Sequence, residues 1–164
     1  MTNSTWKSIS PTQACDWIEF WTDAPWPMDE KETAEYAAQL GWTAEEDDGE
    51  LYLIDAVSGL SMDDVTTATM PSGETGSIGF RLTDVIRDIT DESTEFLNDQ
   101  FTLTYREAQA RWGKAKQETT ESGGGRATWD WEDKARVTLT RLKRSVSVNI
   151  DTPSYAKVLR QLGE

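Results

Sequence analysis

The chain has 164 residues, of which 37% are hydrophobic and 28% charged, and its 30 acidic and 16 basic side chains leave a net charge of -14. This length suits one domain with a sizeable core, no apolar run approaches the roughly 18 residues of a membrane span, and the first twenty residues lack the pattern of a signal peptide. The absence of histidine excludes Ser-His and Cys-His catalytic arrangements, and the single cysteine, Cys15, excludes an internal disulfide and favours a reducing, cytoplasmic location.

Two short helices are expected first. In residues 10–21 (SPTQACDWIEFW), Ser10 can cap a helix, Pro11 suits its first position, and the apolar residues recur at helical spacing. The two prolines of DAPWP end this helix, because proline cannot continue one. Residues 29–42 predict a second helix, in which Asp29 and Glu32 have the spacing of a capping box.

Strand-like sequence follows at residues 50–57, 63–70 and 76–85, with glycine-containing turns between the segments. Residues 45–50 (EEDDGE) read as a polar hairpin turn, with Asp48 and Gly49 as its tight pair.

The second half begins with a long helix over residues 92–112, whose apolar residues follow one face. Residues 116–126 are expected to form a flexible loop, because they are polar and contain three consecutive glycines. Three antiparallel strands and a closing helix follow, at residues 127–133, 135–142, 145–150 and 152–163.

This order predicts an α+β fold: one domain over residues 1–164, with a mostly antiparallel sheet of about six strands. The long helix is expected to pack on one face of the sheet, and short helices are expected at both ends of the chain. The sequence shows no internal repeat with a regular period.

The residues offer little for catalysis. The carboxylates of residues 45–50, with Asp63 and Asp64, could in principle hold a hard cation, but they lack the spacing of a calcium-binding loop. No glycine-rich phosphate loop is present. We therefore expect a binding protein with no catalytic residue, no metal and no cofactor.

The charge is unevenly distributed. Residues 1–64 carry 15 acidic and two basic side chains, whereas residues 101–164 carry eight acidic and twelve basic ones. Such a protein should repel nucleic acid and attract basic partners. The alternative is that acidity only keeps the protein soluble and that the basic residues pair with the acidic half.

One tryptophan stands apart from the periodic patterns. Trp26 lies between two prolines and is flanked by carboxylates, an arrangement typical of an interface anchor, although it could also cover the core as a lid. We hypothesise one acidic partner-binding surface around it, formed by Asp23, Trp26, Asp29, Glu45, Glu46, Asp47, Asp48, Glu50, Asp63 and Asp64.

The segments PWPMDEKETAEYAAQLGW, GFRLTDV, RWGKA and TWDWEDKARVTLTRLKRSVSVNI resemble a family of small, acidic, uncharacterised bacterial proteins, mostly from high-GC Gram-positive species. Members of such families are similar to immunity proteins of polymorphic-toxin systems. The resemblance implies a cytoplasmic inhibitor that binds a basic toxin or effector domain, and it carries over no catalytic residue.

Three alternatives stay open. The order of elements also resembles small acidic type III secretion chaperones, which hold an effector and are usually dimers, whereas an inhibitor is expected to be a monomer. An acidic nucleic-acid mimic would carry carboxylates at phosphate-like spacing. A hydrolase that uses carboxylates and a metal would bind divalent ions.

Overall fold

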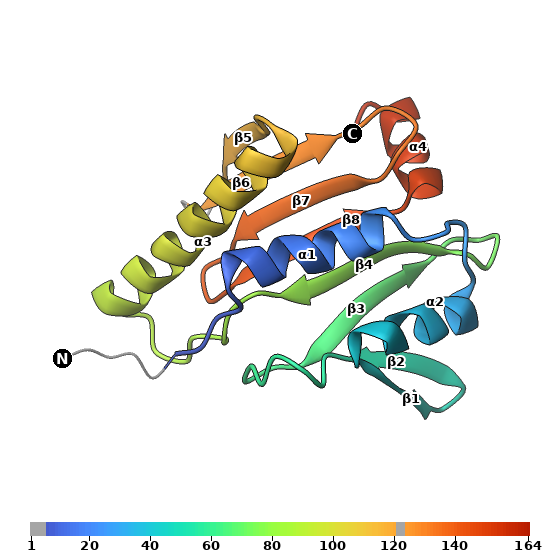
Figure 1. The fold of residues 1–164 in the computed structure, drawn as a ribbon, viewed down its shortest axis with the longest axis horizontal. Helices are drawn as coiled ribbons and strands as arrows, with labels where there is room; N and C mark the ends of the chain where they lie inside the picture. The colour runs from blue at the N-terminus through green and yellow to red at the C-terminus, as the bar shows by residue number, and fades with distance from the viewer. Residues whose placement is uncertain (1–5, 121–123) are drawn as a thin grey trace.

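The computed structural model of the chain describes residues 6–120 and 124–164 as one α+β domain built on an eight-stranded antiparallel sheet (Figure 1). The helices are α1 (Pro11–Thr22), α2 (Glu30–Ala37), α3 (Asp91–Trp112) and α4 (Pro153–Gln161), and a 3-10 turn, η1 (Ala38–Leu40), extends α2. The strands are β1 (Thr43–Asp47), β2 (Glu50–Ile54), β3 (Asp64–Thr69), β4 (Thr75–Arg81), β5 (Lys116–Thr119), β6 (Gly125–Asp130), β7 (Arg136–Arg141) and β8 (Val146–Asp151).

The order of strands is symmetric about the centre of the sheet. It runs β1-β2-β3-β4-β8-β7-β6-β5, so each half is a four-stranded meander preceded by helix, and the halves join through β4 and β8. Gly79 of β4 faces Asn149 of β8 at the middle of this junction. The chain therefore contains a topological duplication that its sequence does not display.

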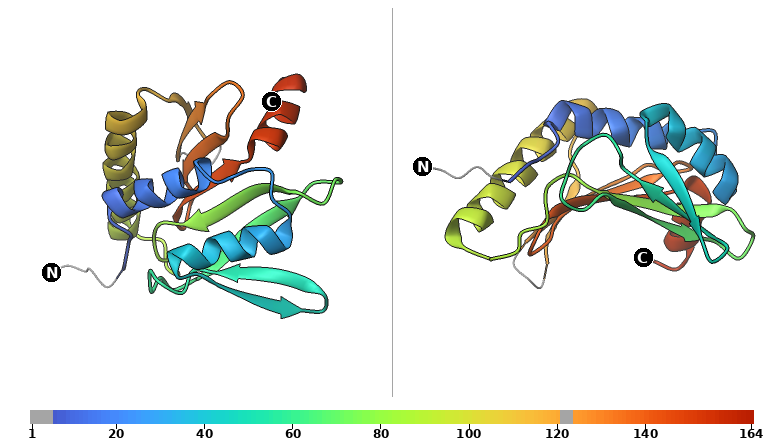
Figure 2. Two further views of the ribbon diagram at one scale, coloured as in Figure 1. Left: turned by 45° about the vertical axis from the view of Figure 1, so that its right-hand side comes forward. Right: turned by 90° about the horizontal axis from the view of Figure 1, so that it is seen from below.

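The two faces of the sheet differ. Helices α1, α2 and α3 lie over one face, and α4 lies on the other side (Figure 2). Side chains alternate accordingly: Ile78 and Val137 are fully buried under the helices, while Thr138 and Asn149 point to the other face, which we call the open face.

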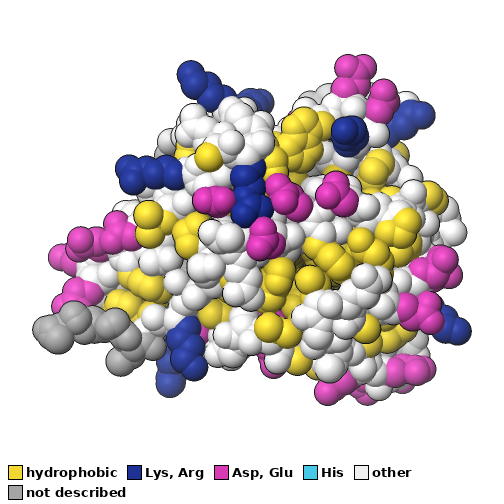
Figure 3. Space-filling view, in the orientation of Figure 1, with side chains coloured by type: hydrophobic (Ala, Val, Ile, Leu, Met, Phe, Trp, Pro, Cys, Tyr) yellow, Lys and Arg dark blue, Asp and Glu magenta, His cyan; other side chains and the backbone are white. Residues whose placement is uncertain are grey.

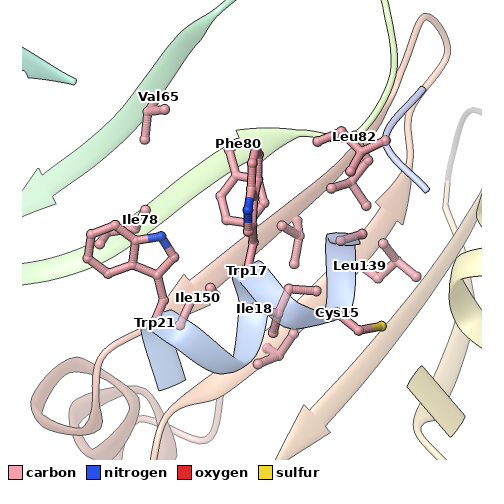
Figure 4. Packing of buried hydrophobic residues seen from close by; sticks show 14 of the residues in the cluster. Cys15, Trp17, Ile18, Trp21, Val65, Ile78, Phe80, Leu82, Leu139 and Ile150 are labelled. Carbon is pink, nitrogen blue, oxygen red and sulfur yellow. The ribbon is translucent and has the colours of Figure 1, made fainter. Parts of the chain in front are cut away.

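The core forms where α1 crosses β4 and β8 (Figure 4). Trp21 is fully buried, and Trp17 packs edge-on against Trp42 and Phe80, with ring centroids 5.4 and 6.0 Å apart. Edge-to-face packing of this kind adds about 0.5–1.5 kcal/mol per pair to the free energy of burial. The apolar residues that recur at helical spacing in this segment, Trp17 and Trp21 among them, thus face the core.

The predicted fold class and helix signals are confirmed. The Asp29 and Glu32 side chains form the capping box of α2, and Gly41, with a φ of 85°, ends η1. Glycine suits this position because a positive φ strains other residues.

Two strands were missed. Residues 45–47 belong to β1 and are not part of the hairpin turn, which is limited to Asp48 and Gly49, both at positive φ. Residues 116–119, expected to be loop, form the edge strand β5. Residues 121–123 of that predicted loop lie outside the described residues.

Candidate partner-binding surface

Trp26 is half-buried and covers part of the core. Its indole ring stacks on that of Trp21, with centroids 6.2 Å apart and planes 27° apart. Its Nε1–H donates a hydrogen bond of 2.8 Å to the backbone oxygen of Trp21. The structure therefore places this residue as a lid with one side open to solvent.

Trp26 belongs to an aromatic cluster between α1 and α2. Phe20 and Tyr36 stack with centroids 4.3 Å apart, and Tyr36 also contacts the ring of Trp21. Burial and the nearby charge of Asp23 raise the pKa of the Tyr36 hydroxyl. Among the predicted residues, Asp23 and Trp26 thus lie on the helix-covered face of the sheet, beside this cluster.

The negative charge is concentrated in a compact part of the fold. Residues 29–55, which form α2, η1, β1 and β2, carry ten carboxylates and one lysine, Lys31. We call this segment the acidic unit. Figure 3 shows Asp and Glu side chains gathered over α2 and the β1–β2 hairpin. Asp29 caps α2, and Asp48 occupies the hairpin turn.

The β1–β2 hairpin divides its carboxylates between the two faces. In the register of the hairpin, Glu45 lies opposite Tyr52 and Asp47 lies opposite Glu50. These positions alternate with that of Leu53, whose side chain is buried on the helix-covered face. Glu45, Asp47 and Glu50 therefore share the open face. Glu46 points to the opposite side. The Tyr52 hydroxyl donates a hydrogen bond to Glu50, which raises the pKa of that hydroxyl.

Asp63 and Asp64 lie where β3 begins. The backbone oxygen of Asp63 accepts a hydrogen bond from the amide of Asp55, and the carboxylate of Asp64 pairs with Arg81 at 2.6 Å. Asp64 faces Ile54 of β2 and so also lies on the open face. The predicted site residues therefore do not surround Trp26. Glu45, Asp47, Glu50 and Asp64 are on one face of the sheet, and Asp23 and Trp26 are on the other.

Five acidic residues elsewhere in the described chain lie in ion pairs with arginine, whereas none in the acidic unit does. Arg111 of α3 contacts Asp16 and Glu19 of α1 at 2.9 and 3.2 Å, and Asp130 pairs with Arg136 and Arg160. Within the described ranges, no carboxylate of residues 29–55 lies in an ion pair. The expectation that the basic C-terminal half neutralises the acidic half is wrong for this unit, because Arg136 and Arg160 pair within their own half.

A groove that the sequence does not predict lies between β2 and β3. The two strands share only two register positions, Leu53 with Val65 and Ile54 with Asp64. Beyond them lies a hollow of about 580 Å³, which we call the β2–β3 groove. Its lining combines aliphatic, hydroxyl and acidic side chains: Glu30, Glu50, Leu51, Tyr52, Leu53, Ile54, Asp63, Asp64, Val65, Thr66, Thr67 and Thr69.

A second hollow, of about 780 Å³, lies on the open face of the other half of the sheet. Its four basic residues, Lys114, Lys116, Arg126 and Arg136, are matched by four acidic ones, Glu118, Asp130, Asp151 and Glu164. Burial raises the pKa of Asp151, against the opposing effects of a hydrogen bond from Asn149 and the charge of Arg136. This balance of charge selects neither an anion nor a cation.

Other kinds of site find little support in the described part of the chain. No group of three or more His, Cys, Asp or Glu side chains there is arranged to hold a metal ion. No described helix is both long and apolar enough to cross a membrane. Cys15 is buried, and burial raises the pKa of its thiol to about 12, which keeps it protonated and poorly reactive.

The chain belongs to DUF6301, a family of unknown function, whose profile matches residues 12–152. No curated protein and no solved structure matches the chain.

Proposed function

We propose that the chain is a non-enzymatic protein-binding module that neutralises a basic bacterial toxin domain in the cytoplasm, as immunity proteins do. The observation that carries this proposal is the acidic unit. It contains ten carboxylates and one lysine, and none of these carboxylates lies in an ion pair among the described residues.

Unpaired like charges on neighbouring elements repel one another and lower the stability of the free protein. A basic partner would relieve this repulsion, and the relief would make the free energy of binding more favourable. Complementary charge would also speed the encounter, because steering raises association rates well above those of neutral surfaces.

A toxin domain that acts on nucleic acid suits this surface, because proteins that contact phosphates gather Lys and Arg around their binding clefts. The exposed Glu45, Asp47 and Glu50 offer such a cleft three carboxylates on one face. The resemblance of the sequence to a family whose members are similar to immunity proteins supports the same class of function.

Co-expression with the toxin domain encoded by the neighbouring gene tests the proposal. The wild-type chain should restore growth and form a complex with the purified domain. Reversal of Glu45, Asp47 and Glu50 to Lys should abolish protection, whereas reversal of the exposed Asp88, Glu95 and Asp99 on and before α3 should leave it intact.

A neighbouring gene without a toxin domain would contradict the proposal, and so would equal protection by the two reversal variants. A stable dimer seen by light scattering would favour the chaperone alternative. Binding of divalent ions seen by calorimetry would favour the metal-dependent hydrolase.

A further inference from the structure

We infer that the β2–β3 groove binds an extended, basic segment of the partner, which enters as an additional strand between β2 and β3. This inference rests on the proposed function, because it specifies how the acidic unit would hold a basic protein.

The first argument is the interrupted ladder. The amide of Asp55 donates to the oxygen of Asp63 at 2.8 Å, and pairing continues through Ile54 to Leu53. It ends there, although β2 runs back to Glu50 and β3 runs on to Thr69. Figure 1 shows β2 and β3 diverging.

The second argument is the direction of the unpaired backbone groups. The other edge of β2 is paired with β1 along its length, and the other edge of β3 is paired with β4. Backbone groups in an antiparallel ladder alternate between the two sides of a strand. Since Asp55 and Asp63 bond across the β2–β3 side, the N–H and C=O groups of Leu51 and Thr67 point into the groove. An inserted strand would satisfy both edges at once.

The third argument is the lining. Leu51 and Ile54 are half-buried, and Tyr52 is 48% exposed, so apolar surface is available to alternate side chains of an extended peptide. Glu30, Glu50 and Asp63 add three carboxylates without an ion pair among the described residues. Basic residues interspersed with β-branched ones therefore fit this lining best.

The closed end of the groove is firmly held. The buried carboxylate of Asp55 accepts hydrogen bonds from the amides of Val57 and Ser58, and that of Asp84 accepts one from the amide of Ser61. These contacts fix the connection from β2 to β3 at the end where the two strands are paired. The edge strand β1 of a second copy is a poor occupant, because it carries Glu45, Glu46 and Asp47.

The test uses the full chain and the capped peptide KVKTKVK, which alternates lysine with strand-forming residues. Calorimetry should detect binding, and amide hydrogen exchange should slow at least tenfold at Leu51 and Thr67. The same peptide methylated on alternate backbone nitrogens keeps its charge but loses donors, and it should bind at least tenfold more weakly. Glu50→Lys should weaken binding similarly, while Glu95→Lys on α3 should not.

The acidic peptide EVETEVE serves as a charge control. The inference would be overturned if KVKTKVK did not bind, or if the methylated peptide or EVETEVE bound with equal affinity. Unchanged hydrogen exchange at Leu51 and Thr67, or a dimer of the chain that protects the groove, would also overturn it. The inference and the proposed function can fail separately. A toxin domain that binds through Glu45, Asp47 and Glu50 without protecting these amides would contradict strand addition alone. Peptide insertion together with a toxin interaction insensitive to charge reversal would contradict the function alone.

Discussion

Leu53 of β2 and Val65 of β3 face each other at the last paired position between these strands. Both side chains are buried. The two strands are paired from this position towards the loop that connects them, and they are unpaired from it towards the tip of the β1–β2 hairpin. This position therefore divides each strand into a part that is hydrogen-bonded to strands on both edges and a part that is hydrogen-bonded on one edge.

The free protein should show this division in its hydrogen exchange. The amides of Leu53 and Leu51 point to the same side of β2, but only that of Leu53 meets a paired strand. The Leu51 amide should therefore exchange at least about tenfold faster, since unpaired backbone groups open at little cost. NMR-detected exchange measures both sites in one sample, and equal protection would show that the groove is closed in solution.

Arg111 should stabilise the packing of α3 on α1. Its guanidinium contacts Asp16, Glu19 and Glu107, and these partners are partly exposed. Arg111→Met should lower the free energy of unfolding by about 1 kcal/mol in total, because partly exposed ion pairs contribute little each. Urea denaturation measures the change. Arg106→Met, an exposed position on the same helix, serves as the control, and an equal loss there would remove the role of the ion pairs.

Asp151 should destabilise the fold at neutral pH. Burial raises the pKa of its carboxyl, so the folded state binds this proton more tightly than the unfolded state and stability falls as pH rises through the two pKa values. Asp151→Asn should therefore raise the Tm at about pH 7 and change it little at about pH 3, where the carboxyl is protonated. The exposed Asp133→Asn is the control. A lower Tm at neutral pH would mean that attraction to Arg136 outweighs burial.

Cys15 should be inert in the folded protein. Burial raises the pKa of its thiol to about 12, and the side chain has no solvent access. A thiol reagent such as DTNB should react only after the chain is unfolded in guanidinium, because the thiolate is the reactive form. Rapid labelling of the native protein would contradict the packing of α1.

Sequence patterns predicted the parts of the fold that have a buried side. Ile78 and Phe80 alternate because one face of β4 is in the core, and the helix caps at Ser10 and Asp29 have local signatures. Strands β1 and β5 were missed because every residue in them is exposed. An edge strand without a buried face leaves no hydrophobic alternation to detect.

The candidate surface was predictable in charge but not in shape. The excess of carboxylates in residues 29–55 can be counted directly. The β2–β3 groove depends on where a ladder between two strands ends, which is decided by packing of distant residues. The position of Trp26 was also non-local, because it depends on how the loop folds back onto Trp21.

The dissociation constant of the complex with the neighbouring toxin domain, measured by calorimetry, tests the central claim most directly. Reversal of Glu45, Asp47 and Glu50 to Lys should weaken binding at least a hundredfold, about 2.7 kcal/mol. Reversal of Asp88, Glu95 and Asp99 makes the same change in net charge and should weaken it less than about threefold, or roughly 0.7 kcal/mol. Equal dissociation constants for the two variants would contradict the acidic unit as the partner-binding surface.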